Sequence, residues 1–257
     1  MGQQILRTAL LAGALLAGAP SAYADSFVNG NFETGDLSGW TQGGGYWRGG
    51  WPINPSTYQP GGSHYNASGI ADSVVTPGLD PNTNNNLNRV YSGNYSARIN
   101  NDSRNESVST LSQTVNNYTD SHIYFAWAAV LEGSHYQDDS DNFTLTLTDL
   151  TRSLTLYDVS YSSASAENTS LFHQSSTGWF YTDWQVQDLD VSAYSGDDFN
   201  LTLLAADCPY GAHAGYVYLD GFGAVTPPTS TVPEPAALAL MAFGLIGLGG
   251  TRKRASR

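Results

Sequence analysis

The chain has 257 residues, only 13% of them charged, and a formal net charge of −13 at pH 7. From Asp25 to Thr231 there are 22 Asp or Glu residues against five Arg, which gives this part a formal charge of −17. An acidic surface repels phosphate backbones, whose binding needs clustered Lys and Arg, so nucleic acid is excluded as a partner. Divalent cations and neutral or cationic ligands stay open, as does the simpler interpretation that the acidity keeps the domain soluble.

Residues 1–24 have the three parts of a secretory signal peptide. Arg7 gives a weak positive start, residues 8–19 are apolar, and Ala22-Tyr23-Ala24 fits the small-x-small rule for cleavage. The apolar stretch is too short for a comfortable membrane span, which argues against an uncleaved anchor. Cleavage after Ala24 would start the mature chain at Asp25.

The other end carries a second targeting pattern. The triplet Pro233-Glu234-Pro235 is followed by an apolar run over residues 236–248 and then by Arg252, Lys253 and Arg254. This order resembles the PEP-CTERM sorting signal of Gram-negative bacteria. The resemblance implies that the tail holds the protein in the inner membrane until an exosortase cuts near the triplet. The protein would then reach the cell surface or the extracellular matrix.

The physical properties of residues 233–257 agree with this sorting role. The positive-inside rule places the basic cluster in the cytoplasm and the large domain outside. A transmembrane helix over residues 235–251 reaches only about 25 Å at about 1.5 Å per residue, a short span that suits a temporary hold. An ordinary permanent anchor has the same topology and stays the alternative. Residues 226–232 are rich in Pro and Thr and are expected to form a linker.

Between these ends, apolar residues mostly alternate with polar ones, as in half-buried strands. The pattern predicts strands over residues 143–147, 153–161, 199–203 and 216–219, and a strand buried on both faces over residues 122–130. No stretch of ten or more residues has a convincing amphipathic helix pattern. The sequence therefore predicts an all-β fold, an antiparallel β-sandwich over residues 25–225. The polar region from Trp47 to Arg89 is expected to form loops on one end or face.

Residues 28–40 and 92–99 resemble segments of galactose-binding-like jelly-roll domains, the fold of several carbohydrate-binding modules. Residues 184–196 and 207–220 resemble the closing strands of surface modules in bacterial secreted proteins. The resemblance implies a jelly-roll sandwich and a role in glycan contact or adhesion, but the fold hosts many functions.

Calcium is the first candidate ligand. Jelly-roll binding modules often use a structural calcium ion to tie the first strand to the last, and the matching carboxylates here are Glu33, Asp36 and Asp220. A hard cation takes six to eight oxygen ligands, so carbonyl groups around Asn31 would complete the set. The alternative is a solvated turn at Glu33 and Asp36, with Asp220 accepting local backbone hydrogen bonds. Residues 138–142 are a second acidic loop, but a solvated hairpin tip explains them more simply.

A glycan is the second candidate ligand. Flat aromatic rings stack on the apolar faces of sugar rings, while amides and carboxylates bind the hydroxyl groups. Tyr46, Trp47, Trp51 and Tyr58 cluster in a Gly-rich loop and could form such a platform. The alternative is that some of these rings cover the sandwich. The remaining tryptophans are expected in the core or at its rim: Trp40, Trp127, Trp179 and Trp184.

Enzymatic motifs are missing from the sequence, including Gly-x-Ser-x-Gly, His-Glu-x-x-His and the P-loop. His135 and His213 are expected to form loop hydrogen bonds, and Cys208, the only cysteine, is expected to be buried beside a turn. We therefore expect an exported, non-catalytic protein that binds glycans or adheres within a biofilm. A structural matrix or surface-layer component and a polysaccharide-active enzyme are the alternatives.

Overall fold

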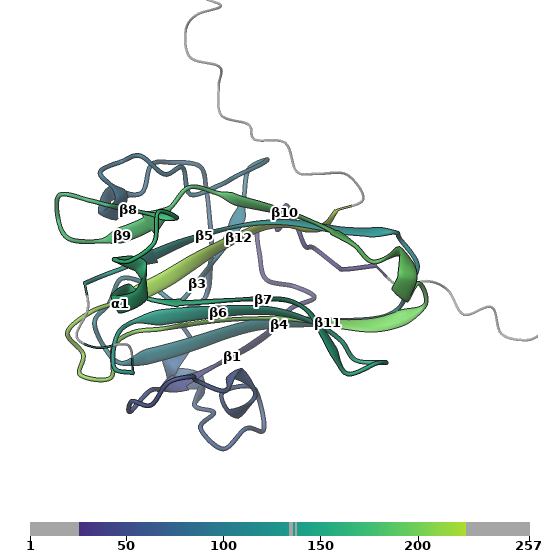
Figure 1. The fold of residues 1–257 in the computed structure, drawn as a ribbon, viewed down its shortest axis with the longest axis horizontal. Helices are drawn as coiled ribbons and strands as arrows, with labels where there is room; N and C mark the ends of the chain where they lie inside the picture. The colour runs from purple at the N-terminus through teal and green to yellow at the C-terminus, as the bar shows by residue number, and fades with distance from the viewer. Residues whose placement is uncertain (1–25, 134–135, 137, 225–257) are drawn as a thin grey trace, which may run out of the picture.

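The computed structural model describes residues 26–133, 136 and 138–224, which form two antiparallel β-sheets packed face to face (Figure 1). The predicted signal peptide, the predicted linker, the predicted sorting tail and His135 lie outside the described residues. The first sheet, sheet A, has five strands. Their spatial order is β1 (Thr41–Tyr46), β4 (Ser107–Tyr118), β11 (Asp197–Ala206), β6 (Asn142–Asp149) and β7 (Leu154–Ser162).

The second sheet, sheet B, has seven strands. Six of them follow the order β2 (Ser73–Val75), β3 (Ser96–Ile99), β12 (Gly215–Ala224), β5 (His122–Leu131), β9 (Phe180–Thr182) and β8 (Phe172–Gln174). β10 (Gln185–Asp190) also pairs with β5, next to β9. The chain repeatedly crosses between the sheets, from β3 to β4 and from β11 to β12, so the jelly-roll sandwich predicted from the sequence is confirmed.

Side-chain alternation builds the core between the sheets. Residues 143, 145 and 147 of β6 point inward, and they pair with the inward residues 205, 203 and 201 of β11. Phe125 and Trp127 of β5 pack against them from sheet B. Each such Leu or Phe side chain contributes about 1.5–3 kcal/mol when fully buried. Alternation in the sequence predicted four strands and a continuous apolar run predicted the fifth, over residues 122–130, and all five are present.

Helical structure is minor in the described residues. It consists of one four-residue helix, α1 (Ser163–Ala166), and four 3₁₀ turns. The turns are η1 (Pro55–Thr57), η2 (Ala67–Gly69), η3 (Pro81–Thr83) and η4 (Ser192–Tyr194).

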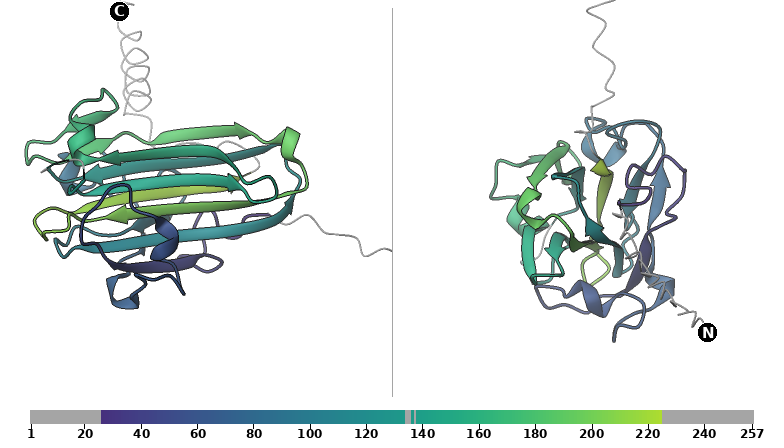
Figure 2. Two further views of the ribbon diagram at one scale, coloured as in Figure 1. Left: turned by 60° about the horizontal axis from the view of Figure 1, so that its bottom comes forward. Right: turned by 90° about the vertical axis from the view of Figure 1, so that its right-hand side faces the viewer.

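The region from Trp47 to Arg89 is mostly irregular, as predicted, but it does not lie on one face. Its first part crosses the outer face of sheet A. In the left view of Figure 2, this part is the purple-to-blue chain that runs in front of the sheet. Its second part covers the outer face of sheet B, where Asp80 accepts hydrogen bonds of 2.8 Å from the hydroxyls of Tyr216 and Tyr218. The region therefore covers both sheets, because each sheet has an apolar outer patch that needs covering.

Buried carboxylates stabilise the end of the sandwich where β12 begins. Asp207 accepts hydrogen bonds from the Asn100 amide and the Ser107 hydroxyl, both at 2.9 Å, and from the backbone N–H of Gly215 at 3.3 Å. These bonds join the end of β3 to the starts of β4 and β12. Asp141 accepts a hydrogen bond of 2.7 Å from the Ser163 hydroxyl, while its Oδ2 is buried without a partner.

Burial makes these groups harder to ionise. It raises the pKa of Asp207 to about 6 and that of Asp141 well above its usual range, and the nearby Asp207 adds to the second shift. Asp72, which accepts the Asn100 N–H at 3.3 Å, has its pKa raised to about 8 by burial. An unfolded Asp titrates near ~3.9, so the folded domain holds extra protons above that pH.

We expect the domain to lose stability as the pH rises. The contribution of these groups is complete below about pH 4 and is lost as the pH passes through the folded pKa values of about 6 and about 8. Thermal melts should show a melting temperature several degrees lower at about pH 9 than at about pH 5. In the Asp72→Asn variant, the melting temperature should fall less steeply above about pH 7. Asp158→Asn, at an exposed position of β7, should leave this fall in melting temperature unchanged. Equal slopes in the wild type and Asp72→Asn would contradict the assignment.

Candidate functional site

A run of three glycines in β1 allows the chain to pass close to both sides of this strand. A Cβ atom at Gly43 would lie 2.5 Å from the Tyr58 carbonyl, and one at Gly45 would lie 2.4 Å from the His64 carbonyl. On the opposite side, a Cβ atom at Gly44 would lie 2.8 Å from Ile70. Real Cβ atoms do not approach this closely, so only glycine fits at these positions.

Backbone hydrogen bonds close the following segment into a loop over sheet A. Gly44 donates its N–H to the Tyr58 carbonyl at 2.8 Å, and His64 donates to the Thr57 carbonyl at 2.8 Å. Trp47 donates to the Glu106 carbonyl at 2.9 Å, and Arg48 forms an ion pair with the Glu106 side chain. We call residues 47–64 the pocket loop.

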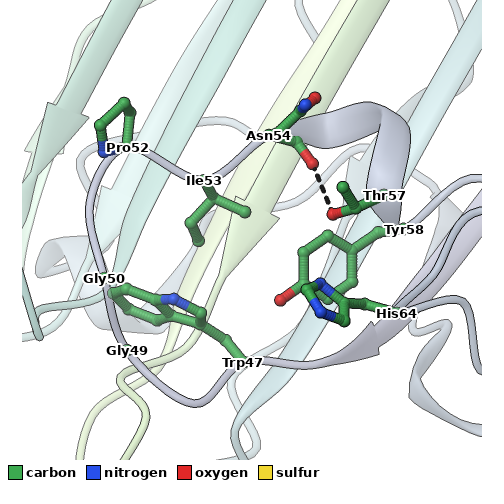
Figure 3. Close-up of a pocket in the computed structure, with 9 residues that line it drawn as sticks. All are labelled: Trp47, Gly49, Gly50, Pro52, Ile53, Asn54, Thr57, Tyr58 and His64. Carbon is green, nitrogen blue, oxygen red and sulfur yellow. Dashed lines mark hydrogen bonds between the residues drawn. The ribbon is translucent and has the colours of Figure 1, made fainter.

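The pocket loop surrounds a cavity of ≈ 160 Å³ (Figure 3). All of the lining residues come from this single segment, and the chain runs round the cavity from Trp47 through η1 to His64. They are Trp47, Gly49, Gly50, Pro52, Ile53, Asn54, Thr57, Tyr58 and His64.

The wall of the pocket has an apolar part and a polar part. Trp47 and Tyr58 are only 2% and 4% exposed and pack with Ile53 on an outer-face cluster of sheet A, made of Val108, Leu204 and Ala206. The polar part comes from Asn54, Thr57 and His64. The Thr57 hydroxyl donates to the Asn54 carbonyl at 2.8 Å, which is the bond drawn in Figure 3. The lining thus combines flat apolar groups with hydrogen-bonding groups.

Two neighbouring loops contact the pocket loop. Gly50 donates its N–H to the Asp138 carbonyl at 3.2 Å, and a Cβ atom at Gly49 would lie 3.8 Å from Pro209. These two loops carry Tyr136 and Tyr210, which are 76% and 68% exposed. They are more exposed than any aromatic residue singled out from the sequence. The only sequence signal that could have identified them is their position in polar loops.

The predicted platform of four exposed aromatic rings is not present in this form. Trp47 and Tyr58 are wall residues of a pocket, because the loop folds back on sheet A and buries both rings. Tyr46 is half-buried and bonds the Ser68 carbonyl through its hydroxyl at 3.1 Å, away from the pocket lining. Trp51 is half-buried and does not line the cavity. Ligand binding by these residues stays a prediction, now with a different geometry.

Glu33 and Asp220, two of the three predicted calcium ligands, bind the same short segment. Glu33 accepts the N–H groups of Asn94 and Tyr95 at 2.8 and 3.0 Å, and Asp220 Oδ2 accepts that of Ser92 at 2.9 Å. Burial, with the charge of Glu33 as a smaller cause, raises the pKa of Asp220 to about 7. Asp220 Oδ1 is buried without a hydrogen-bond partner, which is the observation that favours a cation here.

Asp36 does not join this pair. It is exposed and accepts the Ser38 N–H and the Thr34 hydroxyl at 3.0 and 2.7 Å, and these hydrogen bonds lower the pKa of its carboxyl group. Among the described residues no three His, Cys, Asp or Glu side chains are grouped to hold a metal ion. A calcium site would therefore need carbonyl oxygens beside Glu33 and Asp220. Calcium binding stays a prediction.

The second acidic loop is divided by the fold. Asp141 points into the sandwich end described above, so a wholly solvated hairpin tip is a wrong description of residues 138–142. Cys208 is fully buried beside the turn over residues 208–211, as predicted. Trp40, Trp127 and Trp179 are buried and Trp184 is half-buried, which confirms their assignment to the core or its rim.

Comparison with known proteins identifies one motif. Residues 231–254 match the PEP-CTERM protein-sorting motif. The chain therefore carries this motif, which indicates an exported, sorted protein. No curated protein matches the chain. Among the described residues, no helix has the length and apolar character needed to cross a membrane.

Several solved structures are similar at low identity. TmCBM61, solved in complex with β-1,4-galactotriose, is 14% identical with a TM-score of 0.40, over 77% of this chain and 96% of that one. CBM28, a carbohydrate-binding module specific for non-crystalline cellulose, is 13% identical with a TM-score of 0.36, over 74% and 89%. The K2 adhesin domain of Lys-gingipain is 10% identical with a TM-score of 0.33, over 78% and 95%.

Calcium should stabilise the domain if Glu33 and Asp220 hold the ion. A ligand at 100 times its Kd adds about 2.7 kcal/mol to the free energy of unfolding, so chelation should lower the melting temperature by at least about 5 °C. Asp220→Asn and Glu33→Gln should abolish the response to calcium, and Asp36→Asn should keep it. A melting temperature that chelator and added calcium leave unchanged would rule the site out.

Proposed function

We propose that this protein is an exported, non-catalytic carbohydrate-binding protein of the cell surface or polysaccharide matrix, and that its sugar site is the pocket loop. The observation that carries the proposal is the cavity of ≈ 160 Å³ whose lining includes the aromatic rings of Trp47 and Tyr58 and the polar groups of Asn54, Thr57 and His64. A sugar ring has apolar C–H faces and polar hydroxyl edges, so it matches a wall of this mixed kind.

The charge of the domain favours a neutral sugar. The net charge of −17 between Asp25 and Thr231 would repel uronic acids and sulfated sugars. The ion pair of Arg48 with Glu106 leaves no excess positive charge beside Trp47 for binding an acidic ring. A neutral exopolysaccharide is therefore the ligand class that we propose for a biofilm setting.

The lining also supports a non-catalytic role. Glycoside hydrolysis uses two carboxyl groups about 5–9.5 Å apart on either side of the scissile bond. None of the nine residues that line this pocket is Asp or Glu. A polysaccharide-active enzyme would need its carboxylate pair elsewhere on the domain, and the pocket gives no support for that alternative.

The sorting motif supplies the route in this proposal. The signal peptide directs export, the tail holds the protein in the inner membrane, and an exosortase removes the tail near Pro233-Glu234-Pro235. β12 begins at Gly215, near the loops that contact the pocket loop, and ends at Ala224 at the other end of the sandwich. The pocket would thus face away from the membrane while the protein is still anchored.

A second candidate is a structural matrix or surface-layer component without a soluble ligand. The unpartnered Asp220 Oδ1 favours this candidate, because a calcium ion bound there would stiffen the domain. A stiffer domain would resist mechanical force within a matrix. The two candidates differ in what they bind: the first needs a sugar and the second needs only calcium.

Two asparagines offer a matched test of the sugar site. Asn54 lines the pocket and Asn66 does not, yet each caps a 3₁₀ turn by accepting an N–H two residues ahead at 3.1 Å. Replacing either with Ala should cost a similar cap energy of about 1 kcal/mol. Only Asn54→Ala should weaken glycan binding, by about three- to tenfold for one lost hydrogen bond. A glycan array followed by calorimetry measures this. Equal affinities in both variants would place binding elsewhere, and an array without any hit would refute sugar binding.

Removal of the tail can be tested by tagging both ends of the mature chain. An epitope after Arg257 should disappear from the surface-exposed protein while an epitope after Asp25 remains. Replacement of Pro233, Glu234 and Pro235 by Ala should keep both epitopes on one membrane-bound species. Retention of the C-terminal epitope in the wild type, at the cell surface, would indicate a permanent anchor.

A further inference from the structure

The size of the cavity and the path of the chain around it restrict how a polysaccharide can enter it. We infer that the pocket binds one terminal or branch sugar ring end-on, and does not bind a run of rings within a chain. This inference rests on the proposed function, since it names the part of the polysaccharide that the same site would recognise.

The volume of the cavity favours binding of a single sugar ring. A cavity of roughly 150 Å³ is enough to hold a benzene ring. The pocket, at ≈ 160 Å³, therefore has room for one six-membered ring and no room for two. Any second sugar ring has to lie outside the walls.

The path of the protein chain around the cavity also favours end-on binding. A polysaccharide that passes through a site needs two open ends, as in a groove between separate loops. Here one continuous segment goes round the cavity from Trp47 through η1 to His64 (Figure 3). Backbone hydrogen bonds fasten it at Trp47, which donates to the Glu106 carbonyl at 2.9 Å, and at Tyr58, whose carbonyl accepts the Gly44 N–H at 2.8 Å. On the side of sheet A, the lining residues Trp47, Ile53 and Tyr58 pack on the apolar cluster of Val108, Leu204 and Ala206. A ring therefore enters from the solvent side, and the rings that follow it lie outside the loop.

The residues at the mouth of the pocket are polar and favour an entering ring that keeps contact with solvent. His64 and Asn54 are exposed at the surface, whereas Trp47 and Tyr58 are buried in the wall. A ring that enters therefore meets the polar groups of Asn54 and His64 at the mouth, and only the small exposed part of Trp47 and Tyr58 behind them. The next ring of the chain would meet the exposed loops that carry Tyr136 and Tyr210, where stacking adds at most about tenfold.

The inference predicts how affinity depends on chain length. The probes are methyl glycosides of glucose, galactose and mannose, and the β-1,4-linked oligosaccharides of each sugar with two to six rings. For the sugar that binds, affinity should rise by no more than about tenfold from one ring to two. It should then stay within about threefold from two rings to six, because only the chain end is bound.

Two substitutions of Thr57 test whether the sugar binds in the pocket. Thr57→Trp fills the cavity and should abolish binding of the monosaccharide and of the hexasaccharide alike. Thr57→Val keeps the volume, removes one hydroxyl group and should reduce affinity by no more than about tenfold. Far-ultraviolet circular dichroism and thermal melts establish that both variants are folded.

The possible outcomes separate this inference from the proposed function. Affinity that keeps rising about tenfold or more from two rings to six would overturn end-on binding and leave sugar binding intact. Undiminished binding by Thr57→Trp would overturn it too, because the sugar would then lie outside the pocket. If no probe binds the wild-type protein at any length, the proposed function falls, and the inference falls with it.

Discussion

The pocket depends on the absence of side chains in β1. Gly43, Gly44 and Gly45 allow backbone to lie against both sides of an edge strand at distances where no Cβ atom fits. One consequence is that Tyr58 and His64 can close over the outer face of sheet A. Another is that Trp47, directly after the strand, turns into the covered space. A side chain at Gly43 or Gly45 would displace the pocket loop and expose the apolar patch beneath it.

Most of the predicted strands were recognisable because one face is buried and the other is more exposed to solvent. β6 shows this clearly, since Phe143, Leu145 and Leu147 alternate with threonines along its whole length. The longest strand, β4, was not predicted, because its inward positions include Ser109 and Gln113 beside Leu111 and Val115. Gln113 is buried to bind the Val28 backbone, with its amide oxygen accepting at 2.6 Å and its nitrogen donating at 2.9 Å. Such a polar inward residue destroys the alternating pattern although the strand is buried.

The site was harder to predict, because burial of the aromatic rings depends on a partner far away in the sequence. Trp47 and Tyr58 in a Gly-rich loop look exposed as long as the surface beneath them is unknown. One signal was present: the end of β11, from Leu203 to Ala206, is apolar at four consecutive positions. A half-buried strand alternates, so an unbroken apolar run indicates that both faces are covered. That run predicts a cover over sheet A, but not which loop provides it.

Strand direction joins the pocket to the sorting motif. The described chain leaves the sandwich at Ala224, and the matched motif begins at residue 231. The six residues between them can span at most about 21 Å, so the sorting motif begins close to the end of β12. Because β12 starts at Gly215, beside the loop that contacts Gly49, the pocket side of the sandwich is the far end. Asp220 lies in the second half of β12, toward Ala224, and its buried Oδ1 has no hydrogen-bond partner. The pocket and the carboxylate pair Glu33 and Asp220 are therefore separate features of the domain, so a ligand at one would leave the other accessible.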